Sequence, residues 1–180
     1  MWILRFLFSA DILNSFFNSF NSSTRSKFSL EISNLLKELS ISAENKNLKI
    51  HIISPDQLEI YTDKRRLHQI LVNLIGNAIK FTDEGNIIIK ARLSNKKIKI
   101  SIKDHGIGIK KEDLSKLFKP FSRIVDPEKS KEGSGLGLYL SKKLAKLLGG
   151  KIIVQSQYRK GSTFKLILDS IELESLNHSL

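Results

Sequence analysis

The chain has 180 residues, of which 41% are hydrophobic and 27% charged, a composition typical of a globular protein that forms one domain with a sizeable core. It contains no cysteine, which excludes disulfides, thiolate zinc sites and thiol nucleophiles. Lysine and arginine outnumber the acidic residues by 30 to 18, and the formal charge of +12 favours acidic or phosphate-bearing partners. Because the basic residues are scattered and not interleaved with aromatics, we expect solvated faces and no nucleic-acid partner.

The amino-terminal segment, residues 1–17, is apolar, but Arg5, Asp11 and Asn14 interrupt it well short of the ~20 apolar residues of a membrane span. Its apolar residues recur at helical spacing, so we predict no membrane span but an amphipathic helix. This helix either packs on its own domain or provides a surface for a partner or a homodimer. Residues 18–27 are rich in serine and asparagine, which predicts a linker and a domain boundary.

Hydrophobic periodicity predicts alternating helices and strands beyond the linker. We expect helices over residues 30–44, 64–81, 112–118 and 138–148, and strands over residues 48–53, 58–61, 86–93, 97–103, 151–156 and 163–168. The isoleucines of residues 97–103 alternate with polar residues, as in a strand that is buried on one face only. We therefore predict an α+β fold, a two-layer α/β sandwich with helices on one face of a mixed sheet. Its domain covers residues 28–169, and a tail follows over residues 170–180.

The helix predicted over residues 64–81 has two faces. One is an apolar stripe, and the other, roughly 115° away at ~100° per residue, is formed by Asn73, Asn77 and Lys80. Asparagine has a weak helix propensity, so two asparagines four residues apart cost stability unless their amides are used. They either bond a neighbouring loop or serve a ligand. Carboxamide oxygens suit Mg²⁺ and a lysine can neutralise phosphate, so the stripe favours a metal-bound polyphosphate.

Two glycine motifs follow this helix in the sequence. Asp104, Gly106 and Gly108 come directly after the alternating strand, where a carboxylate can accept a hydrogen bond from an exocyclic amine and glycines let the backbone turn against a planar ligand. The same pattern also occurs in ordinary turns. Further on, the sequence GSGLG precedes the last helix, whose first N–H groups and dipole favour phosphate oxygens. Its GxGxG spacing is neither a Walker A loop nor a GxGxxG motif.

Together these motifs resemble, in order and spacing, the boxes of the histidine kinase ATP-binding domain, which has the Bergerat-type ATP-binding fold. This domain belongs to a superfamily shared with type II topoisomerases, a heat-shock chaperone and mismatch-repair ATPases. LVNLIGNAIKFT resembles the N box, DHGIGI the G1 box, LFKPFSRI the F box and GSGLGL the G2 box. The resemblance covers residues 28–169.

The resemblance implies a role in Mg-ATP binding for each motif. Asn77 would ligate Mg²⁺ with support from Asn73, and Lys80 would approach the phosphates. Asp104, which is followed by Gly106 and Gly108, would bind the adenine amino group. The backbone that closes over the triphosphate would be that of Gly133, Ser134, Gly135, Leu136 and Gly137.

The F box is expected to form the base of a lid over the nucleotide. Phe118 and Phe121 would anchor it on either side of Pro120, and the charged residues 122–132 would be its mobile part.

Asn73 favours a kinase over a hydrolase. Family members that hydrolyse ATP resemble one another in carrying glutamate at this position, because water as a nucleophile needs a general base. The anti-sigma-factor serine kinases also have glutamate there. An amide cannot take the proton, so the residue favours transfer to a histidine, which when neutral is itself a nucleophile.

None of the four histidines fits the acceptor motif of the family, the H box. His51 lacks the following acid and its proline falls one position early, while His68, His105 and His178 are expected in solvated or structural roles. Residues 1–17 instead resemble the end of the second helix of the dimerisation hairpin.

We therefore expect the carboxy-terminal part of a sensor kinase that passes the ATP γ-phosphate to a histidine hairpin of a partner chain and on to a response regulator. We expect it to be cytoplasmic or held at a membrane by a parent or partner kinase. The alternatives are a non-catalytic nucleotide-binding regulatory module and a truncated relic.

Overall fold

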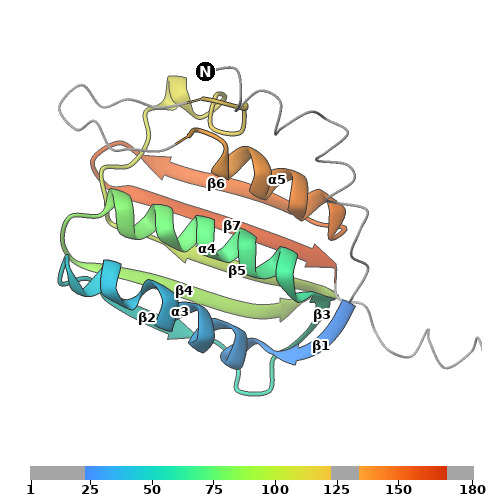
Figure 1. Ribbon diagram of the computed structural model, residues 1–180. Coiled ribbons are helices and arrows are strands. Elements are labelled where there is room, and N and C mark those ends of the chain that lie inside the picture. Colours follow the sequence, from blue (N-terminus) through green and yellow to red (C-terminus); the bar gives the residue numbers. More distant parts are fainter. Residues whose placement is uncertain (1–22, 123–133, 170–180) are drawn as a thin grey trace, which may run out of the picture.

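The protein forms one sheet-and-helix domain in a computed structural model that describes residues 23–122 and 134–169 (Figure 1). In chain order its elements are β1 (Ser23–Lys27), α3 (Phe28–Glu44), β2 (Lys49–Ile53), β3 (Glu59–Asp63), α4 (Lys64–Phe81), β4 (Asn86–Ser94), β5 (Lys97–Lys103), the 3-10 turn η1 (Lys111–Asp113), α5 (Gly137–Leu147), β6 (Lys151–Gln157) and β7 (Gly161–Asp169).

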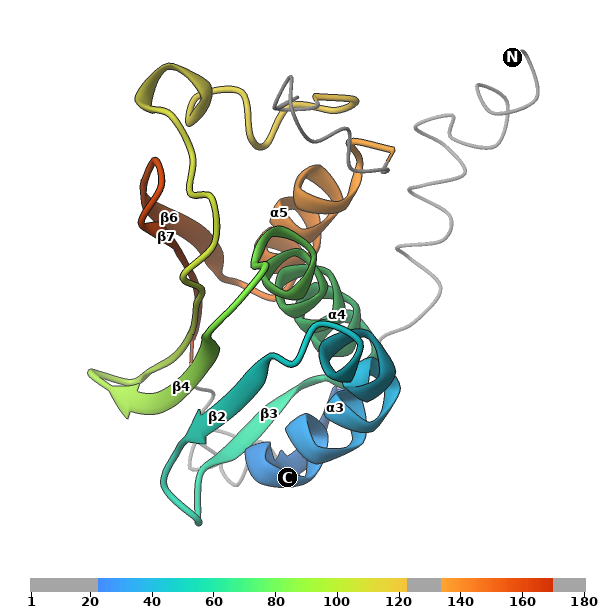
Figure 2. The ribbon, with the colours of Figure 1, turned by 90° about the vertical axis from the view of Figure 1, so that its left-hand side faces the viewer.

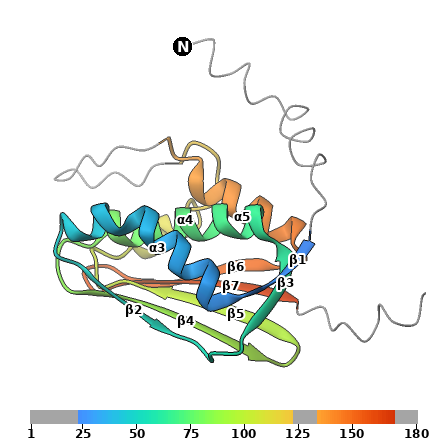
Figure 3. The same cartoon turned by 60° about the horizontal axis from the view of Figure 1, so that its bottom comes forward.

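The main sheet has five strands in the order β2-β4-β5-β7-β6. The pair β2 and β4 is parallel and the other pairs are antiparallel, so the sheet is mixed. Helices α3, α4 and α5 lie together on one face of the sheet (Figures 2 and 3). The predicted two-layer α+β sandwich is therefore confirmed. No helix in the described part of the chain is both long and apolar enough to cross a lipid bilayer.

The core lies between α4 and the sheet. The predicted apolar stripe of α4 is buried, including Leu67, Ile70 and Leu74, and it packs in one cluster with Ile98 and Ile100 of β5. Each such side chain contributes about 1.5–3 kcal/mol relative to its exposed state. The two-residue period of β5 turns its lysines to the opposite face. Burial of this stripe fixes the rotation of α4, and thus the direction of its polar face.

Two stretches differ from the sequence prediction. Within the predicted linker, Ser23–Lys27 forms β1, which pairs antiparallel with β3 in a second, two-stranded sheet. Strand pairing uses backbone groups, so a polar composition does not exclude it. The division into domains stays a prediction, because residues 1–22 and 170–180 lie outside the described residues.

The helix predicted over residues 112–118 is also absent. After η1, backbone hydrogen bonds join Lys116 to Asp113 and Lys119 to Lys116, each spanning three residues instead of the four of an α-helix. A seven-residue helix is too short to be stable without packing. The segment is therefore a series of tight turns.

Lys46, in the turn after α3, closes the carboxyl end of α4. Its Nζ donates hydrogen bonds to the carbonyl oxygens of Ile79 (3.0 Å), Lys80 (2.9 Å) and Thr82 (2.8 Å), and lies 3.6 Å from the Asp83 carboxylate. A cation at this position satisfies the last carbonyls of the helix and complements its dipole.

Replacing Lys46 with methionine is expected to lower the free energy of unfolding by about 2 kcal/mol, because carbonyls at the end of α4 lose a charged donor. Urea denaturation would measure the change. Lys37→Met is the matched control, since Lys37 is an exposed lysine of α3. Equal losses in the two variants would contradict a capping role for Lys46.

Candidate functional site

The polar face of α4 carries two asparagines with different environments. Asn73 donates a hydrogen bond from Nδ2 to Ser141 Oγ on α5 at 2.8 Å. Its Oδ1 lies against the start of α5, where a Cβ atom placed on Gly137 would be only 2.1 Å away. Asn77, one turn further along and half-buried, makes no hydrogen bond with any described residue. Asn73 therefore joins two helices, whereas the carboxamide of Asn77 is available to a ligand.

Asp104 is fixed at the end of β5 with one carboxylate oxygen open. The side chain is only 5% exposed, and its Oδ1 accepts hydrogen bonds from the backbone N–H groups of Gly106 and Ser162, each at 3.0 Å. No described residue donates a hydrogen bond to Oδ2. Burial raises the pKa of this carboxyl above its ordinary value, and the two backbone hydrogen bonds oppose that rise. The geometry suits a carboxylate that accepts from an amine.

The glycines after Asp104 bring this turn against the protein's own backbone. A Cβ atom on Gly106 would lie 2.1 Å from the carbonyl oxygen of Phe81, the last residue of α4, and the N–H of Ile107 donates to that oxygen at 3.2 Å. A Cβ atom on Gly108 would lie 2.0 Å from the carbonyl oxygen of Gln157. The structure shows that the turn is clamped between α4 and β6, and the contact with a planar ligand stays a prediction.

Lys80 lies next to this junction. Its Nζ is 5.4 Å from the ring centroid of Phe81, its neighbour in the last turn of α4. The lysine thus occupies the end of α4 that the Asp104 turn contacts.

The two ends of the predicted lid meet in space. A Cβ atom on Gly135 would lie 2.8 Å from the Phe121 carbonyl carbon and 3.0 Å from the Ser122 carbonyl oxygen. Phe118 packs against the core with Lys142 Nζ 5.2 Å from its ring centroid, but Phe121 is 68% exposed. Gly133 and residues 123–132 of the predicted lid lie outside the described residues.

The glycine-rich turn leads directly into α5, which begins at Gly137. The N–H of Leu136 donates to Ser134 Oγ at 3.3 Å, and Leu136 is the N-cap residue, without a side-chain cap. Through Asn73, this helix start is held against the middle of α4. The described parts of the three predicted motifs are therefore all connected to one helix.

Comparison with known proteins agrees with this arrangement. The family model described as "Histidine kinase-, DNA gyrase B-, and HSP90-like ATPase" matches residues 62–171. The chain belongs to this ATPase family. The resemblance stated from the sequence motifs is thereby confirmed, and the protein is a histidine kinase-type ATP-binding domain.

Its similar proteins are sensor kinases. The signal transduction histidine-protein kinase BarA of Escherichia coli K12 is 46% identical over 124 residues, which are 65% of this chain and 13% of BarA. The aerobic respiration control sensor protein ArcB of the same strain is 38% identical over 133 residues, 71% of this chain and 17% of ArcB. The chain thus spans less than a fifth of the length of these relatives.

The fold of the ATPase domain is also that of solved histidine kinase catalytic domains. The nucleotide-free catalytic domain of histidine kinase ThkA superimposes with a TM-score of 0.73 at 25% identity, and the match covers 83% of this chain and 96% of that one.

Two residues that hold the site of this ATPase domain were not singled out from the sequence. Ser141 is buried with Leu144 and Ala145 on α5, so one polar residue on an apolar helix face was an available signal. Ser162 acts through its backbone N–H, which has no side-chain signal. Its position depends on the register between β5 and β7, in which Lys103 pairs with Thr163.

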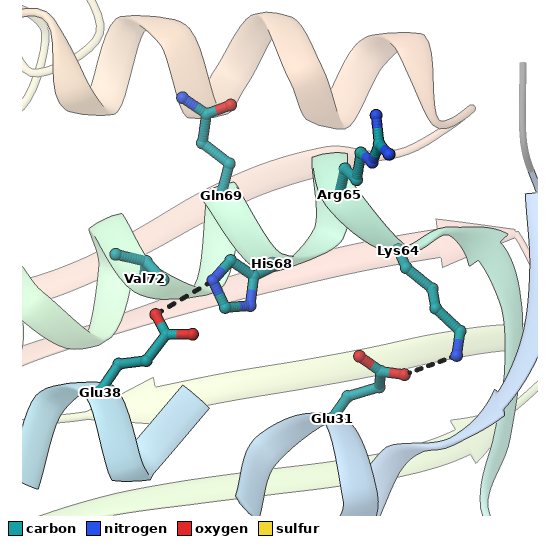
Figure 4. Close-up of a pocket in the computed structure, with 7 residues that line it drawn as sticks. All are labelled: Glu31, Glu38, Lys64, Arg65, His68, Gln69 and Val72. Atoms are coloured by element: carbon teal, nitrogen blue, oxygen red, sulfur yellow. Dashed lines mark ion pairs between the residues drawn. The ribbon is translucent and has the colours of Figure 1, made fainter. Parts of the chain in front are cut away.

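A separate groove of about 520 Å³ lies between α3 and α4 of the ATPase domain (Figure 4). Two side-chain contacts bridge it, the ion pair of Lys64 with Glu31 at 3.1 Å and the contact of His68 Nε2 with Glu38 at 3.2 Å. Gln69 also lines it, and none of the residues predicted to bind ATP does. The groove is therefore distinct from the predicted nucleotide site.

Proposed function

We propose that this domain is the ATP-binding catalytic module of a two-component sensor kinase, which transfers the γ-phosphate of ATP to a histidine on a dimerisation hairpin of a partner chain. The hairpin then passes the phosphate to a response regulator. The observation that carries the proposal is the rigidly held Asp104 carboxylate with a free Oδ2, clamped to the helix on which Asn77 keeps a free amide. Family membership and the named histidine kinases among its relatives support it.

The described residues fit Mg-ATP. Oδ2 of Asp104 would accept the hydrogen bond of the adenine amino group, the Asn77 amide oxygen would ligate Mg²⁺, and Lys80 would neutralise phosphate charge. Bound Mg-ATP supplies the phosphoryl group, and transfer needs mainly positioning and charge neutralisation from the protein.

Asn73 has a supporting role in this proposal and is not itself a ligand of the metal. Because its Nδ2 already bonds Ser141, its contribution to the metal site is support of the α4–α5 junction, next to the backbone of Gly137 that would face the phosphates. Its amide cannot deprotonate water, which favours phosphoryl transfer over hydrolysis.

The acceptor histidine is assigned to the partner because none of the described histidines lies in an H box, and two of them already contact other groups. His68 pairs with Glu38, and Nδ1 of His105 lies 2.9 Å from the carbonyl oxygen of Asn86. His51 is exposed on β2.

Replacing Asn77 with alanine is expected to weaken ATP binding roughly tenfold or more when Mg²⁺ is present, because a hard oxygen ligand of the ion is lost. In EDTA the affinities of wild type and variant should be nearly equal. Isothermal titration under both conditions measures the difference. Asn34→Ala on the exposed side of α3 is the matched control. Equal weakening with and without Mg²⁺ would contradict metal ligation.

Transfer itself is tested by incubating the chain with γ-labelled ATP and a separately expressed histidine kinase hairpin that carries the acceptor histidine. Acid-labile label on the hairpin is the expected result. Nucleotide binding without any label on the hairpin would favour the non-catalytic binding module instead.

A further inference from the structure

The face of the main sheet that points away from the helices is strongly basic. The helices cover only one face of the sheet (Figure 2). Strand side chains alternate between the two faces, so the positions that alternate with the buried residues of a strand face away from the helices. Six outward cations on four adjacent strands define what we call the basic sheet face: Lys90, Arg92, Lys99, Lys103, Lys151 and Lys165.

The strand register brings these cations together without compensating acids. Arg92 lies directly opposite Lys99, and Lys90 and Lys165 flank Ser101 in one row across three strands. Like charges directly opposite each other destabilise a sheet. Asp169 is the one acidic residue in the five strands, and it pairs with Lys97.

Two lysines of the basic sheet face donate hydrogen bonds to side chains, and both acceptors are neutral. Lys99 Nζ donates to Ser94 Oγ at 3.3 Å, and Lys165 Nζ donates to Gln155 Oε1 at 2.7 Å. Such bonds orient the ammonium groups but leave their charge uncompensated.

The start of α4, on the helical side of the molecule, is organised differently. There, Lys64 pairs with Glu31 (3.1 Å) and Arg66 pairs with Asp63 (3.5 Å). The excess positive charge of the described strands is thus concentrated on one surface, at a cost in sheet stability that an anionic partner would remove.

We propose that the basic sheet face docks on an anionic lipid membrane surface. Lysine supplies five of its six cations, and lysine is depleted at protein–protein interfaces, where tyrosine, tryptophan and arginine are enriched. No phenylalanine, tyrosine or tryptophan lies on this face of the five strands for bases to stack on. At ~4.8 Å per strand, the sheet is about 20 Å wide, too wide for the ~12 Å major groove of DNA.

The composition of the face also fits a lipid headgroup layer. Ile153 and Ile167 lie among the lysines and face outward with them. Lysine stems can cover such apolar surface while their ammonium groups reach the phosphates. Docking through this face leaves α4 and α5, which carry predicted ATP-binding residues, on the opposite side of the sheet (Figure 3).

The test is sedimentation of the whole chain with vesicles of 30% phosphatidylserine in phosphatidylcholine, compared with pure phosphatidylcholine, at ~150 mM salt. Each lysine near an anionic surface raises membrane partitioning roughly fivefold, so Lys90→Gln, Lys99→Gln and Lys165→Gln together should lower it about 100-fold. The control combines Lys37→Gln, Lys111→Gln and Lys146→Gln, which remove the same charge from exposed lysines outside the five strands. It should retain most of the binding.

Wild-type binding that requires phosphatidylserine, falls with salt and is lost only in the sheet variant supports the proposal. Equal losses in both triple variants would overturn it, because net charge alone would then explain binding. So would equal binding to pure phosphatidylcholine, or displacement from vesicles by duplex DNA or polyglutamate at matched charge. Retention of wild-type ATP affinity shows that the sheet variant is folded. If neither the wild type nor the variants bind ATP while the lipid results hold, only the proposed kinase function fails.

Discussion

Replacing Asp104 with asparagine is expected to weaken ATP binding by two orders of magnitude or more. Oδ1 of the new amide can still accept the hydrogen bonds from Gly106 and Ser162, which places its NH₂ group where Oδ2 now lies. A donor would then face the amino group of adenine, also a donor. A site made for one hydrogen-bond pattern rejects a mismatched one strongly, because polar groups are left unpaired. Titration with a fluorescent ATP analogue measures the loss.

Two controls distinguish a loss of the adenine contact from a loss of folding. The substitution preserves shape and both backbone hydrogen bonds and removes a buried charge, so the thermal unfolding transition should not fall. Asp56→Asn, at an exposed turn residue, is the matched control and should bind ATP like the wild type. Wild-type affinity in Asp104→Asn would remove the assignment of Asp104 to the adenine.

The same carboxyl predicts how ATP binding depends on pH. Burial is the largest cause that raises the pKa of Asp104 above the ordinary 3.8, so the folded protein protonates it at a higher pH than an exposed aspartate. A protonated carboxyl is a poorer acceptor, and affinity should fall as pH is lowered toward that raised pKa. Affinity measured across this acidic range should fall in the wild type but not follow the same step in Asp104→Asn.

The effect on stability has the opposite sign. Because the folded-state pKa lies above the unfolded value, Asp104 stabilises the fold when protonated, and this contribution is lost as pH rises through the folded-state pKa. The ionised, buried carboxylate at neutral pH therefore works against folding while it is suited to bind an amine. Such an arrangement is typical of functional groups.

Patterns that depend on one element alone were predicted correctly from the sequence. The 3.6-residue period of α4 gave its buried stripe, and therefore the polar face with Asn73 and Asn77. The two-residue period of β5 gave its buried face and placed Asp104 at its end. In both cases the side chains that pack are also those that carry the signal.

Features that depend on contacts between distant elements were not predicted. Strand β1 exists because its backbone meets β3, and its polar sequence does not show that. The three carbonyls that Lys46 caps lie 33 to 36 residues away in the chain. Likewise, the backbone N–H of Ser162, which donates a hydrogen bond to Asp104, lies 58 residues further along the chain. The register of the sheet determines which residues meet in such pairs, and the sequence of a single chain does not specify that register.

Strand β7, which holds Asp104 through Ser162, also approaches the Asp104 backbone closely at Gly161. We expect Gly161→Ala to lower the free energy of unfolding by about 4 kcal/mol. A Cβ atom there would lie 2.2 Å from the Asp104 carbonyl oxygen and 2.8 Å from the His105 Cα atom, both of them backbone atoms with little freedom to move. A positive φ of 99° adds backbone strain for any L side chain. Strain and overpacking each cost roughly 1–3 kcal/mol.

Gly85→Ala separates the two causes, because Gly85 has nearly the same φ, 100°, but no atom within 4 Å of the new Cβ. Both variants carry the same change in the unfolded chain, so that contribution cancels between them. Urea denaturation should show a loss of about 1–2 kcal/mol for Gly85→Ala, which is strain alone. The excess in Gly161→Ala measures the clash with the Asp104 backbone, and ATP affinity should fall with it, since the carboxylate must move. Equal losses of stability in the two variants would mean that β7 does not press against Asp104.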